Sequence, residues 1–248
     1  MRKIKIGVGF VIGWRSFQKV LKTNILNWKE CGLTEMEEIS LNLFVAYDLK
    51  YNKTQPSDYR NIHPELRSLL DGTYFIGNTK LREEIATLQR EGVLNEREAR
   101  LIFKSGYAGK RNAILYEAVK QGMDCLLFLD DDEYPMAVTK NRDVAIWSGQ
   151  HVLKTHLSHI LDADITHGHH CGYISPIPSF DFNQALSEAD FRLWIQALSN
   201  DILNWDNMLK VMRQGGVTYA DTGVLVEAKP WEVPEVNHTK FISGSNLC

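Results

Sequence analysis

Residues 125–133 have the sequence CLLFLDDDE, an apolar run of five residues followed directly by four acids. An uncharged run of this length is typical of a strand that is buried on both faces. The acids therefore follow the carboxyl end of a strand, and ligands of open α/β sheets bind outside those ends. The segment predicts a buried strand over residues 125–129 and a charged site at its end.

The four adjacent acids of residues 130–133 place carboxylates that repel one another. A divalent cation turns this repulsion into attraction, and Mg²⁺ or Mn²⁺ typically takes one or two carboxylates and completes its shell with water and substrate phosphates. In an extended backbone Asp130 and Asp132 point to the same side, which predicts them as the metal ligands, with Asp131 as the rival ligand. The alternative is a solvated strand end whose acids cap a following helix.

A glycine-rich and basic turn, GYAGKRN at residues 106–112, introduces the helix expected before the acidic strand. It places Lys110 and Arg111 in the first helical turn, where the macrodipole disfavours each cation by roughly 0.3–1 kcal/mol. A phosphate docked on the backbone N–H groups and these side chains offsets that cost, so a nucleotide diphosphate is the predicted ligand. A P-loop is excluded, because Lys104 replaces its first glycine and Arg111 its Ser or Thr. The alternative is that both cations belong to an exposed helix surface.

Strands and helices alternate along the first half of the chain. Apolar and β-branched runs predict further strands over residues 4–12, 41–47 and 73–76. Helical spacing predicts helices over residues 16–28, 79–89 and 94–103, around residues 114–119, and later over residues 152–161 and 188–213. The polar residues 50–64, with two prolines, predict an exposed loop. The alternation favours an α/β fold with a mainly parallel sheet flanked by helices.

The composition of the chain narrows the classes of protein to which it can belong. The chain has 248 residues, 44% of them hydrophobic, which is enough for one large core, and we expect a single domain. A net charge of −3 provides no basic field for nucleic acid or an anionic membrane. No apolar run comes near the roughly 18 residues of a membrane span, so no transmembrane segment is expected. The four cysteines lie apart without CxxC spacing, which favours a reducing, cytoplasmic location.

Three motifs stand out when the chain is taken as a whole. They are the first strand with its end, GVGFVIGWR at residues 7–15, the turn GKRNA at residues 109–113, and the strand end FLDDD at residues 128–132. Together they resemble the family 2-like glycosyltransferases of the GT-A fold. The resemblance implies a Rossmann-like, mainly parallel sheet flanked by helices in one domain over residues 1–248. Its nucleotide-sugar-binding half is expected at residues 1–140 and its acceptor-side half at residues 141–248.

The resemblance also implies roles for individual residues. The end of the first strand and the acid after the second line the base and ribose pocket of that family, and the turn lies near the nucleotide. The acidic run corresponds to the family's DxD motif, which holds Mn²⁺ or Mg²⁺. With the cations of the turn included, the predicted nucleotide-sugar-binding residues are Phe10, Ile12, Asp48, Lys110, Arg111, Asn112, Asp130 and Asp131, and the predicted metal ligands are Asp130 and Asp132.

The last residues of the sequence indicate whether the catalytic base of this family is expected in the chain. Residues 241–247, FISGSNL, resemble the Gly-x-Asn strand that precedes a Glu-Asp catalytic motif in inverting members of the family, and the sequence ends at Cys248. The acceptor-side half is therefore expected to be incomplete, with the family's base absent. Weak base candidates are Asp221, Glu232 and Glu235. Whether the reaction inverts or retains configuration stays open.

A second group of potential metal ligands lies in the later half of the chain. Its members are His156, His159, Asp162, Asp164, His167, His169, His170 and Cys171. His, Asp and Cys all bind zinc, so a zinc-dependent hydrolase is an alternative. The segment lacks HExxH or a similar spaced signature, and dense histidines also occur in polar loops. In a transferase this stretch is expected to shape the donor-sugar or acceptor pocket.

The sequence predicts transfer of a hexose from a UDP- or GDP-linked sugar to a hydroxyl of a glycan or small-molecule acceptor. One alternative is a Mg²⁺-dependent nucleotidyltransferase, although residues 13–16 match its glycine-rich loop poorly. Another alternative is a domain that binds a nucleotide sugar without catalysing its transfer.

Overall fold

The computed structural model describes residues 3–13, 16–33, 39–50, 53–141, 144–149, 151–160, 163–166, 187–198 and 205–206. The chain divides into two compact units. The first contains the described residues of Met1–Pro135 and His151–Gly168, and the second those of Met136–Gln150 and His169–Gly244. The single domain and its two halves, expected from the sequence, stay predictions.

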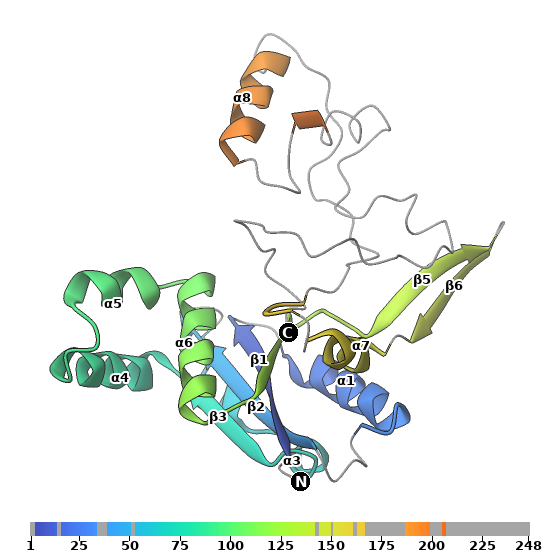
Figure 1. The fold of residues 1–248 in the computed structure, drawn as a ribbon, viewed down its shortest axis with the longest axis horizontal. Helices are drawn as coiled ribbons and strands as arrows, with labels where there is room; N and C mark the ends of the chain where they lie inside the picture. The colour runs from blue at the N-terminus through green and yellow to red at the C-terminus, as the bar shows by residue number, and fades with distance from the viewer. Residues whose placement is uncertain are drawn as a thin grey trace. The chain divides into compact units, whose positions relative to one another are not determined.

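The first unit is built on a four-stranded, all-parallel sheet with the order β3-β2-β1-β4 (Figure 1). The strands are β1 (Ile4–Ile12), β2 (Ile39–Tyr47), β3 (Gly72–Ile76) and β4 (Cys125–Leu129). Val8 in the middle of β1 lies opposite Leu43 of β2 and Leu127 of β4. Both neighbours of β1 are thus apolar strands, and the predicted α/β fold with a parallel sheet is confirmed.

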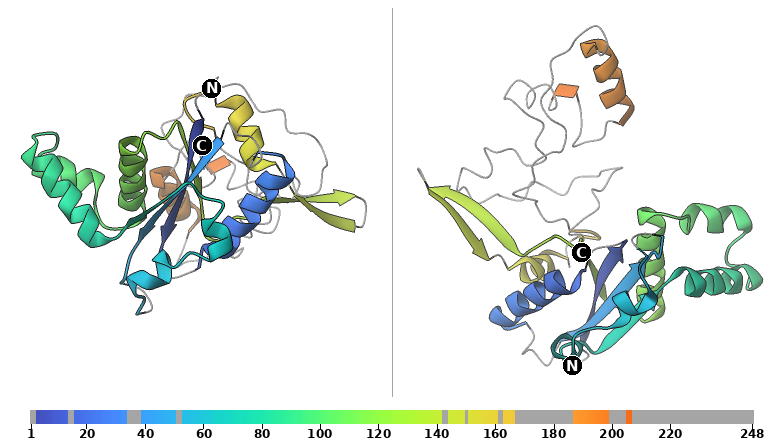
Figure 2. Two further views of the ribbon diagram at one scale, coloured as in Figure 1. Left: turned by 90° about the horizontal axis from the view of Figure 1, so that it is seen from below. Right: turned by 180° about the vertical axis from the view of Figure 1, so that it is seen from behind.

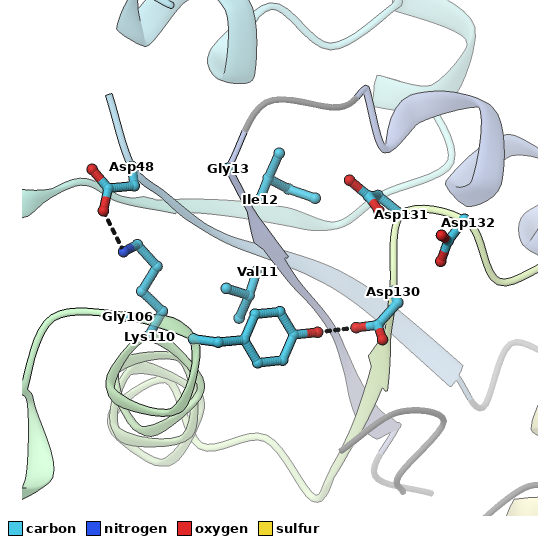
Figure 3. Close-up of a pocket in the computed structure, with 10 residues that line it drawn as sticks. Val11, Ile12, Gly13, Asp48, Gly106, Lys110, Asp130, Asp131 and Asp132 are labelled. Atoms are coloured by element: carbon cyan, nitrogen blue, oxygen red, sulfur yellow. Dashed lines mark hydrogen bonds and ion pairs between the residues drawn. The ribbon is translucent and has the colours of Figure 1, made fainter. Parts of the chain in front are cut away.

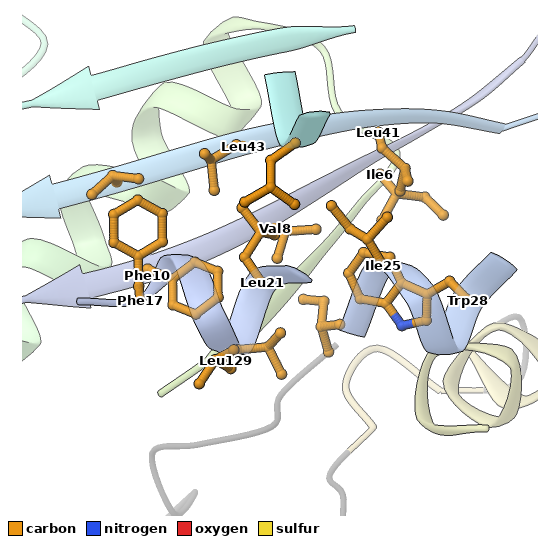
Figure 4. Packing of buried hydrophobic residues seen from close by; sticks show 14 of the residues in the cluster. Ile6, Val8, Phe10, Phe17, Leu21, Ile25, Trp28, Leu41, Leu43 and Leu129 are labelled. Atoms are coloured by element: carbon orange, nitrogen blue, oxygen red, sulfur yellow. The ribbon is translucent and has the colours of Figure 1, made fainter. Parts of the chain in front are cut away.

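Helix α1 (Gln18–Glu30) covers one face of the sheet (Figure 4). Alternate residues of β1, among them Ile6, Val8 and Phe10, point to this face and are fully buried. They pack with Leu21 and Trp28 of α1, which are buried at helical spacing. Each such side chain contributes about 1.5–3 kcal/mol through removal of its apolar surface from water.

Helix α6 (Tyr107–Lys120) covers the opposite face, where β1 presents glycines. A Cβ atom on Gly9 would lie 3.0 Å from Cγ2 of Ile114, so a larger residue here requires Ile114 to shift by a few tenths of an ångström. At the start of α6, a Cβ atom on Gly109 would lie 1.8 Å from the carbonyl oxygen of Lys104. Gly9 thus favours the close approach of α6 to the sheet, and Gly109 favours that of α6 to the chain segment that precedes it.

The remaining described elements of the first unit are α2 (Pro56–Arg60), α3 (Pro64–Arg67), α4 (Asn78–Arg90), α5 (Glu96–Ile102) and α7 (Val152–His159) (Figure 2). Helix α2 and the start of α3 lie within the exposed loop expected over residues 50–64. The two prolines begin these helices instead of breaking them, because proline suits the first helical position. Tyr59 of α2 is buried and stacks on Tyr47 at a centroid distance of 4.8 Å.

The second unit contains an antiparallel hairpin, β5 (Met136–Asn141) and β6 (Val144–Gly149), and the helix α8 (Glu188–Leu198). The sequence pattern does not predict the hairpin, because neither strand alternates apolar and polar residues. The helix expected over residues 188–213 is described as far as Leu198 and again at residues 205–206. None of the helices in the described part of the chain is long and apolar enough to cross a membrane.

Gly109→Ala tests the close approach at the start of α6. We expect a loss of about 1–3 kcal/mol in the free energy of unfolding, because the added methyl group meets a backbone carbonyl that has to shift. Denaturant unfolding followed by circular dichroism measures it. The control is Val119→Ala at an exposed position of the same helix, with an expected change within about 0.5 kcal/mol. Equal stability of the two variants would contradict the packing described here.

Candidate functional site

A pocket of about 500 Å³ opens at the carboxyl ends of the parallel strands, within the first unit (Figure 3). Four segments supply its walls: the end of β1, the residue after β2, the start of α6 and the turn after β4. The lining residues are Val11, Ile12, Gly13, Asp48, Gly106, Tyr107, Lys110, Asp130, Asp131 and Asp132. The acidic strand end and the basic turn, which are separate in sequence, therefore face the same space.

The acids after β4 form a turn. The backbone N–H of Glu133 donates to the carbonyl of Asp130 at 3.2 Å, and the backbone N–H of Asp130 donates to Oε2 of Glu133 at 2.8 Å. Nδ2 of Asn24 in α1 donates to the carbonyl of Glu133 at 3.3 Å and ties the turn to that helix. The extended backbone assumed from the sequence is absent here, so strict alternation does not separate the acids, and all three aspartates line the pocket.

Asp130 lies in a strongly negative environment. Burial raises the pKa of its carboxyl to about 7, and the charges of Glu133, Asp132 and Asp131 contribute to the rise. Its side chain is 32% exposed, and it contacts two residues of α6. The hydroxyl of Tyr107 donates to Oδ1 of Asp130, and a guanidinium nitrogen of Arg111 lies 3.3 Å from the same oxygen. The carboxylate is thus held by the helix that faces it.

Arg111 is held between two aromatic rings. Its guanidinium carbon lies 4.8 Å from the ring centroid of Tyr107 and 5.0 Å from that of Phe128, and its side chain is 11% exposed. Burial lowers the pKa of the guanidinium to about 10, although the charge of Glu133 acts in the opposite direction. Arg111 is therefore a cation at neutral pH, fixed behind the pocket wall formed by Tyr107 and Asp130.

Lys110 and Asp48 form a buried ion pair inside the pocket. Lys110 Nζ donates to Oδ2 of Asp48 at 2.9 Å, with side chains 9% and 7% exposed. The backbone N–H of Lys50 donates to Oδ1 of Asp48 at 3.1 Å. Burial raises the pKa of Asp48, but the bonds from Lys110 and Lys50 and their charges outweigh it, so the pKa is lowered overall. The two cations of the basic turn therefore have different partners.

Three predicted residues, Phe10, Arg111 and Asn112, lie outside the lining of the pocket, and Arg111 lies behind its wall as described above. Phe10 is fully buried in the core, where its ring lies 5.2 Å from that of Phe17. Asn112 donates from Nδ2 to the carbonyl of Ile102 at 2.7 Å, which links α6 to the end of α5. Ile12, Asp48, Lys110 and the three aspartates do line it. Sequence reasoning missed Tyr107, although its position in the basic turn was a usable signal.

The carboxylates fit a metal ion that keeps much of its shell for other ligands. Within the described ranges, no group of three or more His, Cys, Asp or Glu side chains is arranged to hold a metal alone. Mg²⁺ and Mn²⁺ need only one or two carboxylates when phosphates and water complete the shell. Burial and, after it, the charges of the neighbouring acids raise the pKa of Asp130, and a bound cation would relieve the repulsion between those charges. Asp130 and Asp132 stay the predicted ligands.

The rival histidine-rich segment is described only in part. His156 of α7 is buried, and its Nδ1 lies 2.7 Å from the hydroxyl of Thr166. His159 and Asp164 are also described, whereas Asp162, His167, His169, His170 and Cys171 lie outside the described residues. The base candidates Asp221, Glu232 and Glu235 lie outside them as well.

Removal of one partner of the buried ion pair is expected to cost more than removal of both. Lys110→Met leaves the charge of Asp48 unpaired, with an expected loss of about 3–5 kcal/mol in the free energy of unfolding. In the double variant Lys110→Met/Asp48→Asn we expect much of this loss to be recovered. Denaturant unfolding of the two single variants and the double variant gives the coupling. Strictly additive losses would show that the pair is not coupled.

The raised pKa of Asp130 predicts how the free energy of unfolding depends on pH when a metal chelator is present. Above about pH 4 Asp130 is ionised in the unfolded chain, but in the folded chain it keeps its proton up to about pH 7. The folded state binds more protons in this window, so this group's contribution to stability falls as pH rises from 4 to 7. The difference in unfolding free energy between wild type and Asp130→Asn is expected to fall over this range. A difference independent of pH would contradict the burial of the carboxyl.

Comparisons of the chain with protein-family models, with curated proteins and with solved structures give no match.

Proposed function

We propose that the protein is a metal-dependent glycosyltransferase that moves a hexose from a nucleoside diphosphate sugar to an acceptor hydroxyl. One observation carries the proposal. Three aspartates after β4 share a pocket with the start of α6 and with the ends of β1 and β2. Such a pocket offers carboxylates for a cation and helix N–H groups for phosphate oxygens within one space.

The diphosphate of the donor is assigned to the space between α6 and the acidic turn. Gly106 and Tyr107 bring the N-terminal end of α6 to the pocket, where N–H groups point away from the helix. Gly106 adopts a φ of 107°, which glycine tolerates and other residues rarely adopt. Arg111 adds a fixed cation behind Tyr107. The helix N–H groups and Arg111 favour binding of the diphosphate, whose oxygens would also coordinate the metal.

The nucleoside is assigned to the space near Asp48 and the end of β1. Ile12 and Gly13 give this part of the pocket an apolar wall and a bare backbone segment. Asp48 is held by Lys110 and by the backbone of Lys50, so its orientation is set before a ligand arrives. A carboxylate fixed in this way accepts hydrogen bonds from ribose or base donors.

Asp130 and Asp132 are assigned to the metal, with Asp131 as the rival ligand. A bound Mn²⁺ or Mg²⁺ would stabilise the negative charge that develops on the departing diphosphate. Protons would compete with the metal for Asp130, because its raised pKa of about 7 keeps part of the population protonated at neutral pH. The two carboxylates would hold the metal that binds the leaving group, and Arg111, 3.3 Å from Oδ1 of Asp130, would add positive charge nearby.

Calorimetry with UDP, GDP and their sugars, with and without Mn²⁺, tests the proposal. We expect Mn²⁺ to tighten binding of one nucleotide diphosphate by at least about tenfold, equal to 1.4 kcal/mol. Asp132→Ala is expected to abolish this metal dependence. The matched control is Glu91→Ala, an exposed acid at the end of α4, which is expected to bind as wild type does.

The outcomes separate the candidate functions. Unchanged metal dependence in Asp132→Ala would show that the assigned site is wrong. Metal-dependent binding followed by transfer or hydrolysis of the sugar nucleotide supports a transferase. Binding without either reaction supports a nucleotide-sugar-binding domain. A nucleotidyltransferase instead forms a sugar nucleotide and pyrophosphate from a nucleoside triphosphate and a sugar phosphate.

A further inference from the structure

The side chains of Tyr107 and Arg111 both contact one carboxylate oxygen of Asp130, which lines the pocket. The Tyr107 hydroxyl donates to Oδ1 of Asp130, while a terminal nitrogen of Arg111 lies 3.3 Å from that oxygen and 3.2 Å from the Tyr107 hydroxyl. Oδ1 of a predicted metal ligand is therefore already occupied by two donors. We call Tyr107, Arg111 and Asp130 the Asp130 cluster.

The members of the Asp130 cluster differ in their freedom to move. Arg111 is packed on the ring of Phe128 and is 11% exposed. Tyr107 lies one helical turn before Arg111, at the first position of α6, and is 46% exposed. Rotation of the Tyr107 side chain leaves the core intact, whereas displacement of Arg111 disturbs it. Tyr107 is the member that is able to leave Asp130 at low cost.

A divalent cation and the Asp130 cluster compete for the same oxygen. A cation bound to Asp130 withdraws charge from Oδ1, which weakens its bond with the hydroxyl of Tyr107, and it repels the guanidinium of Arg111. A diphosphate oxygen is a charged acceptor of the kind that phenol and guanidinium donors prefer. When both ligands are present, each donor of the cluster exchanges one anionic acceptor for another.

We propose that Tyr107 is a positioning residue that couples metal binding to diphosphate binding. In the ligand-free chain its hydroxyl occupies Asp130, and in the loaded site it donates to the diphosphate. A metal that binds alone weakens the hydrogen bond from Tyr107 to Asp130. When the diphosphate binds as well, its oxygens accept hydrogen bonds from Tyr107 and Arg111. The two ligands therefore bind with positive, reciprocal coupling. This inference rests on the proposed function, because it requires that the pocket binds a metal and a nucleotide diphosphate.

Tyr107→Phe tests the coupling, with Tyr116→Phe as the matched control. Tyr116 lies on the same helix and also donates its hydroxyl to a carboxylate, Glu84 at 3.1 Å, but it does not line the pocket. Titrations measure the affinity for Mn²⁺ alone, for UDP or GDP alone, and for the nucleotide with Mn²⁺ saturating. Tyr107→Phe is expected to bind Mn²⁺ alone about fivefold to tenfold more tightly and the nucleotide with Mn²⁺ more weakly by a similar factor. Thermal melting checks that both variants are folded.

The possible results distinguish this inference from the proposed function. If wild type binds neither nucleotide in a metal-dependent way, the proposed function fails, and the role of Tyr107 fails with it. If wild type shows metal-dependent binding and Tyr107→Phe keeps the wild-type coupling, the proposed function stands and only the role of Tyr107 is overturned. That role is also overturned if Tyr116→Phe changes the coupling as much as Tyr107→Phe does. A reduced coupling in Tyr107→Phe alone supports the inference.

Discussion

The close packing of α6 against β1 is the contact on which the pocket depends. The absence of a side chain at Gly9 favours the close approach of the helix to the sheet, and Gly109 lets the helix begin directly against the carbonyl of Lys104. Because of this approach, Lys110 reaches the end of β2 and Arg111 reaches the end of β4. A helix held farther from the sheet would leave the buried charge of Asp48 without its partner.

Much of the first unit is predictable from sequence. The strand predicted over residues 125–129 is confirmed as β4, and the parallel sheet is confirmed. Both were predictable because a strand that is buried on both faces needs an uninterrupted apolar run, and the helices that cover it need apolar residues at helical spacing. That the acids after β4 share a pocket with Lys110 also follows from sequence, since the carboxyl ends of parallel strands share one edge, whereas Arg111 lies outside the pocket lining. The glycosyltransferase activity and the bound metal, in contrast, stay predictions.

The partners of individual side chains were not predictable. A charged turn predicts an anion site, but the sequence does not reveal that Lys110 pairs with Asp48 while Arg111 turns to Asp130. That division depends on the rotation of α6 over the sheet, which packing alone decides. The turn after β4 likewise depends on Glu133 reaching back to the backbone of Asp130, a local hydrogen bond that overrides the alternation of an extended chain.

The fixed carboxylate of Asp48 has a consequence for recognition. Both of its oxygens accept hydrogen bonds inside the folded chain, from Lys110 and from the backbone of Lys50. The rotameric freedom of this side chain is therefore lost when the chain folds. A ligand that binds to Asp48 causes no further loss of side-chain entropy at this residue. Discrimination at this end of the pocket then depends on shape and donor position, since a rigid acceptor does not adapt to a poorly placed donor.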